Sequence, residues 1–566
     1  MRTHYPRTPH LPWSPGAASD DVRIADLSGL LGREVVVTEK LDGENTTLYA
    51  DGLHARSLDS AHHPSRAWIK ALQGRIGHGI PDGWRVCGEN MYARHSIAYR
   101  DLDSWFYGFS VWDGDGRCLD WDRTVRFLRG LGVPVPAVLW RGVFDRRAER
   151  ALRALKCDTE RQEGYVVRTV DGFGPQEFGQ RVAKWVRTGH VGTDTHWMHA
   201  NVVANGLGPA AALWAVRSGA APDAEALLAA VGVPEGDRAA AGVTEGDRAA
   251  ACDVSARLDV LGRTGDARLA GVLAALLHER PRSFLAGRLA APLGMPAARR
   301  VADLVGLHTG LHRPYPDEKR RTGLVRMSYA VDLDVLHAVA GALASDAEAR
   351  EQVDWSQLHA EGVDVPAGLR EAFAGLDTDA ADRCWAEARE AYAQGRITTA
   401  EEAVAASWRW RSGEFPKLIH MVGPSGSGKS TFAHGLDADA YVSLDDLREA
   451  RGSRADQRAG GDILRAGLER LDTALAEGGT VVWDATSLNP HQRSLVHAVA
   501  RRRDALTTHA VVLVDAAELA RRNADRANPV PPQVLDAQLH RFVPPYPGQA
   551  HRTWYIGAGG TVEEEA

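Results

Sequence analysis

Three stretches of the chain differ in how hydrophobic and polar residues alternate. Residues 1–200 mix short β-type apolar runs, such as 34–40, with amphipathic helical patterns, such as 122–131. Residues 201–410 are rich in Ala, Leu, Arg and Glu at helical spacing, whereas residues 411–566 alternate strand and helix patterns. The pattern predicts a multidomain protein with an α+β domain, an all-α middle domain and an α/β domain with a parallel sheet, in that order.

Composition narrows the class of protein further. The 67 basic and 74 acidic residues give a net charge of −7, which excludes a uniformly basic nucleic-acid coat. No apolar run approaches the roughly 18 to 20 residues of a membrane span, and the first residues lack the apolar core of a signal peptide. The five cysteines are scattered without metal-binding spacing. These observations predict a cytoplasmic protein without membrane contact.

Lysine is rare in this chain, so each lysine can be considered individually as a candidate functional residue. Only seven lysines stand among the 67 basic residues. Arginine stays protonated at any working pH, whereas a lysine amine can lose its proton and act as a nucleophile. A lysine inside a motif is therefore a strong candidate for chemistry.

The third stretch contains a phosphate-binding loop. The apolar run 417–422 leads into Gly-Pro-Ser-Gly-Ser-Gly-Lys-Ser over 423–430, followed by a helical pattern. In such a loop the backbone N–H groups surround phosphates, the lysine reaches the β and γ phosphates, and the serine hydroxyl binds Mg²⁺. The predicted nucleotide-binding residues of the loop are Gly423, Gly426, Gly428, Lys429, Ser430 and Thr431, with Ser430 also a metal ligand.

Segments after the loop suggest what accepts the phosphate. Asp445 and Arg448 follow a predicted strand over 440–444, a Thr-x-Leu-Asn-Pro segment begins at 486, and an Arg-Asn-x-x-Arg segment spans 522–526. In this order they resemble the P-loop polynucleotide 5′-kinase family. The resemblance implies Asp445 as general base, Arg448 as a substrate-phosphate contact, and Arg522 and Arg526 as lid residues on the NTP. Each Asp or Arg alone also fits a helix cap or a solvated helix end.

The first stretch carries a lysine at the end of a predicted strand. Lys40 opens Lys-Leu-Asp-Gly-Glu-Asn, and further motifs follow in order around Arg56, Glu89, Phe109, Glu163 and Lys184. A lysine there can attack the α-phosphate of ATP and hold AMP as a phosphoramidate, provided that nearby positive charge or a metal lowers its pKa.

This ordered series resembles the RNA ligases among the covalent nucleotidyltransferases, over about the first 190 residues. The resemblance implies Lys40 as nucleophile, Glu89 on the ribose, Phe109 on adenine, Glu163 on the metal and Lys184 on the α-phosphate. Asn45 and Arg56 would line the nucleotide pocket. Asn45 stands where DNA ligases of the superfamily usually carry arginine.

The middle stretch offers weaker signals. His308 and His312 are four residues apart, and Asp332 and Asp334 loosely mimic a phosphatase loop, but ordinary helix residues explain both pairs better. Its arginines, among them Arg299, fit contacts with phosphates. A near-repeat of ten residues over 232–251 resembles a duplication in a surface connector.

Together these features predict a bifunctional RNA end-repair enzyme. The predicted domains are a ligase over 1–200, a helical domain of unknown role over 201–410 and a kinase over 411–566. ATP would serve both catalytic domains, with Mg²⁺ or Mn²⁺, and RNA ends would be the partners. Two alternatives remain open: the same chemistry on DNA ends, and a nucleotide-sensing protein that binds nucleic acid without turnover.

Overall fold

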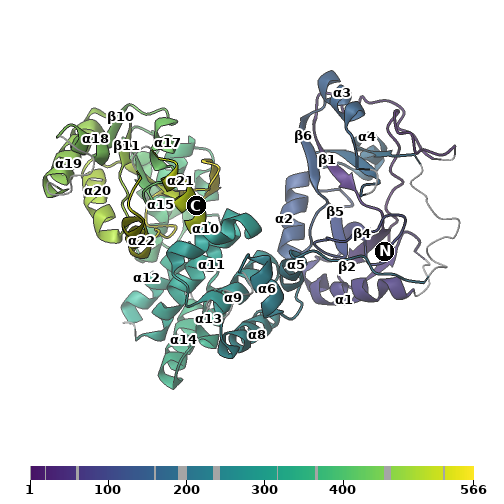
Figure 1. The fold of residues 1–566 in the computed structure, drawn as a ribbon, viewed down its shortest axis with the longest axis horizontal. Coiled ribbons are helices and arrows are strands. Elements are labelled where there is room, and N and C mark those ends of the chain that lie inside the picture. Colours follow the sequence, from purple (N-terminus) through teal and green to yellow (C-terminus); the bar gives the residue numbers. More distant parts are fainter. Residues whose placement is uncertain are drawn as a thin grey trace. The chain divides into compact units, whose positions relative to one another are not determined.

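The computed structural model describes residues 2–566 except 20, 59–62, 159–160, 189–200, 234–242, 315–316, 362, 364–367, 452–459 and 527–528. The chain divides into two compact units (Figure 1). The first unit comprises Met1–Ala241 and Ser255–Leu269, and the second comprises Gly242–Val254 and Ala270–Ala566.

The first unit is built on two antiparallel four-stranded sheets. One has the order β6-β1-β7-β8 and the other the order β3-β2-β4-β5. Their strands are β1 (Glu34–Lys40), β2 (Glu44–Tyr49), β3 (Gly52–Ala55), β4 (Arg85–Asn90), β5 (Phe106–Trp112), β6 (Val138–Val143), β7 (Gly164–Thr169) and β8 (Val182–Val186). The helices are α1 (Ala67–Ile76), α2 (Trp121–Leu131), α3 (Arg146–Ala154), α4 (Phe178–Arg181), α5 (Ala211–Arg217) and α6 (Ala224–Ala230).

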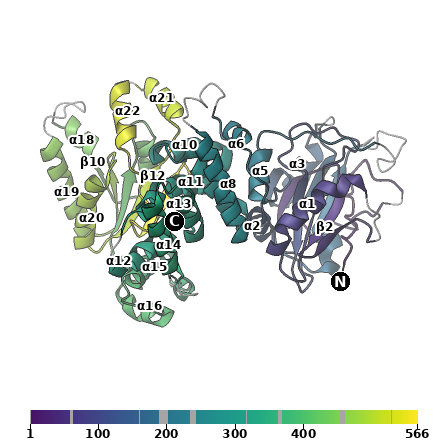
Figure 2. The same cartoon turned by 90° about the horizontal axis from the view of Figure 1, so that it is seen from below.

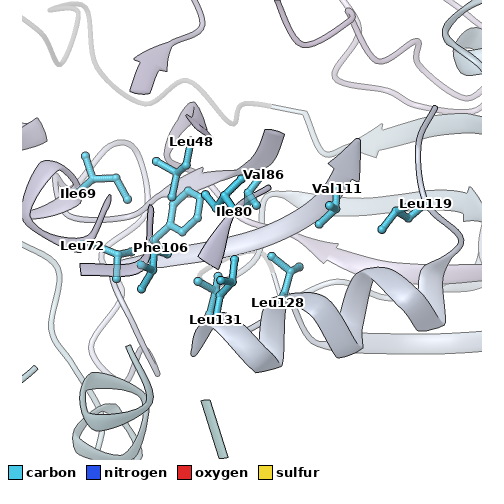
Figure 3. Packing of buried hydrophobic residues seen from close by; sticks show 12 residues of the cluster. Leu48, Ile69, Leu72, Ile80, Val86, Phe106, Val111, Leu119, Leu128 and Leu131 are labelled. Atoms are coloured by element: carbon cyan, nitrogen blue, oxygen red, sulfur yellow. The ribbon is translucent and has the colours of Figure 1, made fainter. Parts of the chain in front are cut away.

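Apolar side chains hold α1 and α2 against the second sheet (Figure 3). Ile69 and Leu72 of α1 and Leu128 of α2 are buried against Phe106 and Val111 of β5. Asp120 caps α2 by accepting a hydrogen bond from the Arg123 N–H, and Gly132 ends that helix with a φ of 76°. Alternating apolar residues in the strands and helical spacing in α1 and α2 thus produce this core.

In the sequence, the stretch between the strands of the first sheets and those of the C-terminal sheet consists of helices. They are α8 (Glu245–Val260), α9 (Gly265–Leu277), α10 (Arg282–Leu293), α11 (Met295–Leu307), α12 (Asp317–Ser328), α13 (Leu333–Ala342), α14 (Ala347–Ala360), α15 (Thr378–Ala393) and α16 (Ala400–Ala406). Between residues 211 and 410, the part of the chain that the structure describes contains no strand. The helical pattern of the sequence is therefore confirmed here.

Within the second unit, a buried ionic network joins this helical region to the C-terminal sheet. Arg299 of α11 contacts Asp303 at 2.7 Å and Glu564 of β14 at 2.8 Å. Asp303 is fully buried and also pairs with Arg282. Arg299 is consequently committed to internal ion pairs, which corrects the expectation that it contacts a nucleic-acid phosphate.

The C-terminal sheet has six strands in the order β10-β11-β9-β12-β13-β14, all parallel except the β13/β14 pair. The strands are β9 (Lys417–Val422), β10 (Ala440–Ser443), β11 (Thr480–Asp484), β12 (Leu506–Val512), β13 (Arg552–Ile556) and β14 (Val562–Glu565). The helices are α17 (Lys429–His434), α18 (Leu444–Glu449), α19 (Gly460–Glu477), α20 (Pro490–Arg502), α21 (Ala516–Ala524) and α22 (Pro532–Arg541). Helices α19 and α20 pack side by side on one face (Figure 2), and α17 covers the other.

The near-repeat is not confined to a connector. Most of its first copy lies outside the described residues, but its second copy forms the start of α8. The reason is local: Thr244 and Asp247 exchange hydrogen bonds that cap the helix, with Asp247 N–H donating to Thr244 Oγ1 and Thr244 N–H donating to Asp247 Oδ2. Pro234 stands at the equivalent position of the first copy.

Candidate active sites

Lys40 ends β1 and lines a cavity of about 960 Å³. In the antiparallel pair of β1 and β7, Lys40 lies opposite Gly164, which brings the preceding residue, Glu163, beside it. The Lys40 Nζ donates a hydrogen bond to Glu163 Oε2 at 2.5 Å. A side chain at position 164 would lie 2.0 Å from the Trp185 carbonyl oxygen, so glycine is needed for β7 and β8 to pair this closely.

Carboxylates dominate the electrostatics around Lys40. Burial opposes its charge, but Glu163 and Glu89, with Asp42, outweigh burial and raise the pKa of Lys40. Burial, reinforced by Glu163, raises the pKa of Glu89 to about 7. Burial and the Lys40 charge lower the pKa of Lys184. These acids therefore favour the ammonium form of Lys40, and the charges of the protein itself do not supply the lowered pKa that a nucleophilic amine needs.

The structure gathers the predicted ligase residues around the same cavity. They come from β1, β2, β4, β5 and β8 and from the segments next to β3 and β7. Those lining the cavity are Lys40, Asn45, Arg56, Glu89, Phe109, Glu163 and Lys184. These residues lie far apart in the sequence, and the folding of the two sheets brings them together.

Backbone pairing fixes several of these positions. Asn45 on β2 lies opposite Glu89 on β4, and Lys184 on β8 lies opposite Val166 on β7. Phe109 is half-buried and meets the Tyr5 ring edge-on at 5.3 Å between centroids. The strand register thus determines which side chains share the cavity.

The cavity also has polar walls that the sequence reasoning missed. Glu44 and Arg66 form a buried ion pair, in which Arg66 Nε donates to Glu44 Oε2 at 2.9 Å. Asp42 accepts hydrogen bonds from the N–H groups of Ser96 and Ile97, at 2.8 and 3.0 Å. Glu44 directly follows the Lys-x-Asp-Gly motif, which is the one signal that could have identified it.

In the second unit, the phosphate loop has the backbone that its glycines predict. Gly423, Gly426 and Gly428 have φ values of 150°, 80° and 102°, in the region that side chains disfavour. The Gly423 N–H donates to the carbonyl of Thr486 at 2.9 Å, which fixes the loop to the segment after β11.

Lys429 is buried beneath this loop. Its Nζ donates to the Pro424 carbonyl at 2.7 Å. Burial lowers the pKa of Lys429 to about 8, against the opposing charges of Asp484 and Asp445. Ser430 and Thr431 follow it and are exposed. Asp484 ends β11, and its negative charge acts on Lys429. The sequence analysis did not select Asp484, although an acid at the end of an apolar strand is a usable signal.

Asp445 and Arg448 lie in α18. Ser443 caps that helix, since its side chain accepts a hydrogen bond from the Asp446 N–H, so Asp445 is not the cap. Strand β10 ends at Ser443, one residue earlier than predicted. Asp445 is 64% exposed and forms an ion pair with Arg448. Its carboxylate is therefore accessible to a molecule that would receive the phosphate.

The two predicted lid arginines lie against the loop from α21 and the residues that follow it. The Arg522 Nη1 donates to the Ser427 carbonyl at 3.1 Å, and Nη2 donates to the Ala558 carbonyl at 2.6 Å. A side chain at Gly426 would lie 3.9 Å from Arg526 Nη1. A second cavity, of about 440 Å³, is lined by the loop, by Arg522 and by the turn 558–560.

The middle-region candidates have ordinary structural roles. His308 Nδ1 lies 2.9 Å from the Val305 carbonyl, and His312 Nε2 lies 2.9 Å from the Ala340 carbonyl. Asp332 caps α13. Among the described residues, neither pair belongs to a metal-binding cluster.

A family model matches the part of the chain that forms the first cavity. Residues 33–186 match the RNA ligase family. This part of the chain is an RNA ligase domain.

The match spans β1 to β8 and therefore all strands of the ligase cavity. Residues 418–545 match the AAA domain family, which here covers the kinase-like P-loop domain from β9 to α22. The two family matches confirm the resemblance of the first part of the chain to RNA ligases and the presence of a kinase-like P-loop domain in the last part.

Solved structures resemble parts of the chain. They include the Naegleria gruberi RNA ligase with PPi, at 19% identity and a TM-score of 0.24, covering 33% of this chain and 59% of that one. An archaeal ATP-dependent RNA ligase shares 14% identity with a TM-score of 0.23, covering 54% and 66%. A sugar kinase from Janibacter sp. HTCC2649 shares 20% identity with a TM-score of 0.21, covering 25% and 86%.

The chain thus spans about 59% of the length of the Naegleria gruberi RNA ligase. No curated protein matches the chain. Among the described residues, no helix combines the length and the apolar character needed to cross a bilayer.

Proposed function

We propose that the chain repairs RNA ends in two steps: a kinase step on a 5′-hydroxyl end and a ligase step that seals the resulting 5′-phosphate to a 3′-hydroxyl. The observation that carries the proposal is Lys40 beside Glu163 and Glu89 in a cavity large enough for a nucleotide. The kinase-like domain adds the activity whose product the ligase consumes. The division into domains at 200 and 410 remains part of this proposal.

In the ligase step, the Lys40 amine attacks the α-phosphate of ATP. An N–P bond forms, the bond to pyrophosphate breaks, and AMP remains on Lys40. Lys184, which lines the same cavity, neutralises charge on the α-phosphate, and Phe109 packs on adenine. AMP then passes to the RNA 5′-phosphate, and the 3′-hydroxyl displaces it.

A divalent cation fits the acids of this cavity. Glu163 and Glu89 offer carboxylate oxygens, the ligands preferred by Mg²⁺ and Mn²⁺. Glu163 and Glu89 would hold such a cation, which would supply positive charge against the phosphates, and Glu163 would then no longer be reserved for the Lys40 ammonium. Glu163 would then release the amine, whose proton must leave before attack.

In the kinase step, the loop amides and Lys429 hold the NTP phosphates, and Arg522 and Arg526 close over them. Asp445 accepts the proton of the 5′-hydroxyl as its oxygen attacks the γ-phosphate. Ser430 and Asp484 supply the oxygens that suit Mg²⁺. Arg448, which forms an ion pair with Asp445, contacts a phosphate of the incoming strand.

Labelled ATP tests the ligase step. Wild type incubated with α-labelled ATP and Mg²⁺ should acquire a covalent label that Lys40→Ala lacks and Lys429→Ala retains. A wild type that never labels would overturn the ligase proposal and favour a nucleotide sensor.

End-sealing assays test the substrate. RNA strands with 5′-hydroxyl and 3′-hydroxyl ends should be joined in the presence of ATP, and excess RNA nicks should compete better than excess DNA nicks. Stronger competition by DNA would instead assign the enzyme to DNA ends.

A further inference from the structure

Three histidines meet inside the kinase-like domain, away from the residues assigned above. His420 on β9 and His509 on β12 lie opposite each other on neighbouring parallel strands. His497 of α20 packs over the same face of the sheet. One ring nitrogen from each of the three residues lies within 4.8 Å of those of the other two.

We propose that His420, His497 and His509 bind a divalent transition-metal ion, Zn²⁺ by preference, at a site that ties β9 and β12 to α20. Imidazole nitrogens favour Zn²⁺ and its neighbours in the first transition row over Mg²⁺. The site therefore differs in chemistry from the oxygen-lined site at Ser430 and Asp484.

The spacing of the rings suits a shared ion. Ring centroids are 5.6 Å apart for His420 and His497, 5.5 Å for His420 and His509, and 4.8 Å for His497 and His509. Imidazoles bound tetrahedrally to one Zn²⁺ at about 2.0–2.1 Å would place their centroids about 5 Å apart. His497 is the least buried of the three rings.

Unsatisfied buried nitrogens are the second observation. His420 and His509 are fully buried, yet the Nδ1 atom of each finds no hydrogen-bond partner among the residues that the structure describes. The His497 and His509 Nε2 atoms face each other at 2.8 Å, a contact in which only one ring can donate. A buried polar atom without a partner lowers the stability of the folded protein, and a bound metal ion would give the lone pairs of these nitrogens a partner.

The neutral state of the three rings favours metal binding, whereas one neighbouring positive charge opposes it. Burial lowers the pKa of His497 to about 4, and burial also lowers the pKa of the other two rings, so all three are neutral at pH 7. Arg493, one turn before His497 on α20, adds a positive charge that acts on all three rings. Three protein ligands leave one tetrahedral position open, and Arg493 favours a small anion there.

The site would stabilise the strand that leads into the phosphate loop. The His420 ring lies within β9, two residues before the loop-preceding Val422, and its Nε2 contacts Ser487 Oγ at 2.8 Å. Ser487 has a φ of 47° and follows Thr486, whose carbonyl holds Gly423. A bound ion would thus reduce motion on both sides of the loop.

Cobalt titration of the full chain tests the proposal. Chelator-treated protein is titrated with Co²⁺ in excess Mg²⁺, which fills oxygen-lined sites. Wild type should take up one Co²⁺ with the visible absorption bands of tetrahedral nitrogen coordination, and Zn²⁺ should displace it and raise the melting temperature. Absence of these bands at saturating Co²⁺ would overturn the proposal without any variant.

Matched variants on α20 locate the ion. His497→Ala should weaken Co²⁺ binding at least about tenfold. His491→Ala, which removes an exposed histidine of the same helix, should leave binding unchanged. If His497→Ala fails to fold, His497→Gln serves in its place. Equal binding by the His497 and His491 variants would assign the ion to another part of the chain.

Discussion

The Lys40 Nζ lies 2.5 Å from Glu163 Oε2, although 123 positions separate the two residues in sequence. The pairing of β1 with β7 creates this contact, since Lys40 stands opposite Gly164. The proposed nucleophile and the proposed metal ligand are therefore positioned by one strand register, and a shift of that register by one residue would separate them.

Lys40→Arg should abolish self-adenylylation while the fold is retained. Arginine keeps a positive charge beside Glu163, but its guanidinium stays protonated and cannot form the phosphoramidate. Covalent label from α-labelled ATP should fall to background, and the thermal unfolding of the variant should match that of wild type. Labelling at the wild-type rate would show that another residue is the nucleophile.

Arg66→Leu should destabilise the ligase domain. The substitution leaves Glu44 buried without its partner, which costs about 3 kcal/mol of unfolding free energy. Urea denaturation measures the loss. The double variant Arg66→Leu with Glu44→Gln should recover part of it, because no uncompensated charge is then buried. A single variant as stable as wild type would mean that the pair contributes nothing.

Asp445→Asn should slow phosphoryl transfer to a 5′-hydroxyl oligonucleotide by roughly 10²- to 10⁴-fold, the usual contribution of a general base. Asp446→Asn is the matched control, since it removes the adjacent carboxylate of α18 and should retain most of the activity. Transfer of γ-label from ATP provides the measurement. If Asp446→Asn proves the more damaging change, the base has been assigned to the wrong aspartate.

Gly287→Ala should loosen the packing of α10 against the segment that follows β12. A Cβ at this position would lie 2.5 Å from the Val514 carbonyl oxygen, so the backbone must shift, at a cost of about 1–3 kcal/mol. A Cβ at Gly310 would meet no atom of the described residues within 4 Å, so Gly310→Ala serves as control. Calorimetry should give a lower melting temperature for Gly287→Ala than for Gly310→Ala. Equal melting temperatures would contradict the close contact.

Acid should destabilise the second unit partly through His308. Burial, with the charges of His312 and His278, lowers its pKa to about 4, so the unfolded chain binds a proton that the folded chain does not. Stability from this residue is complete above about pH 6.5 and declines toward pH 4, by up to about 3 kcal/mol. His308→Asn retains a donor for the Val305 carbonyl and should show a smaller decline in denaturation midpoints between these pH values. Identical pH profiles would rule out His308 as a contributor.

Local patterns predicted much of the fold. The strand over 34–40 and the phosphate-loop strand over 417–422 coincide with β1 and β9, because alternation and flanking glycines define such strands locally. The expected helix over 122–131 begins one residue earlier, at Trp121, where Asp120 caps it. Strand β12 (Leu506–Val512) is buried at every position, so no alternation of polar and apolar residues marks its ends in the sequence.

Partners distant in sequence were harder to predict. Nothing near Arg299 indicates that Glu564 will neutralise it, and nothing near Glu44 indicates Arg66. Asp484 was missed because a single strand-end acid becomes informative only once β11 and β9 are known to be neighbours. The assignments of the proposed site residues themselves stay predictions until the variants are measured.

The segment before the first strand covers one margin of the ligase sheet. Lys184 of β8 donates its N–H to the Pro9 carbonyl, and its own carbonyl accepts from the Leu11 N–H. Without residues 9–11, β8 would present unpaired amides and carbonyls, and an exposed strand edge of this kind can pair with the strand edge of another chain. Shortening this end of the protein would therefore risk aggregation during purification, whatever its effect on nucleotide chemistry.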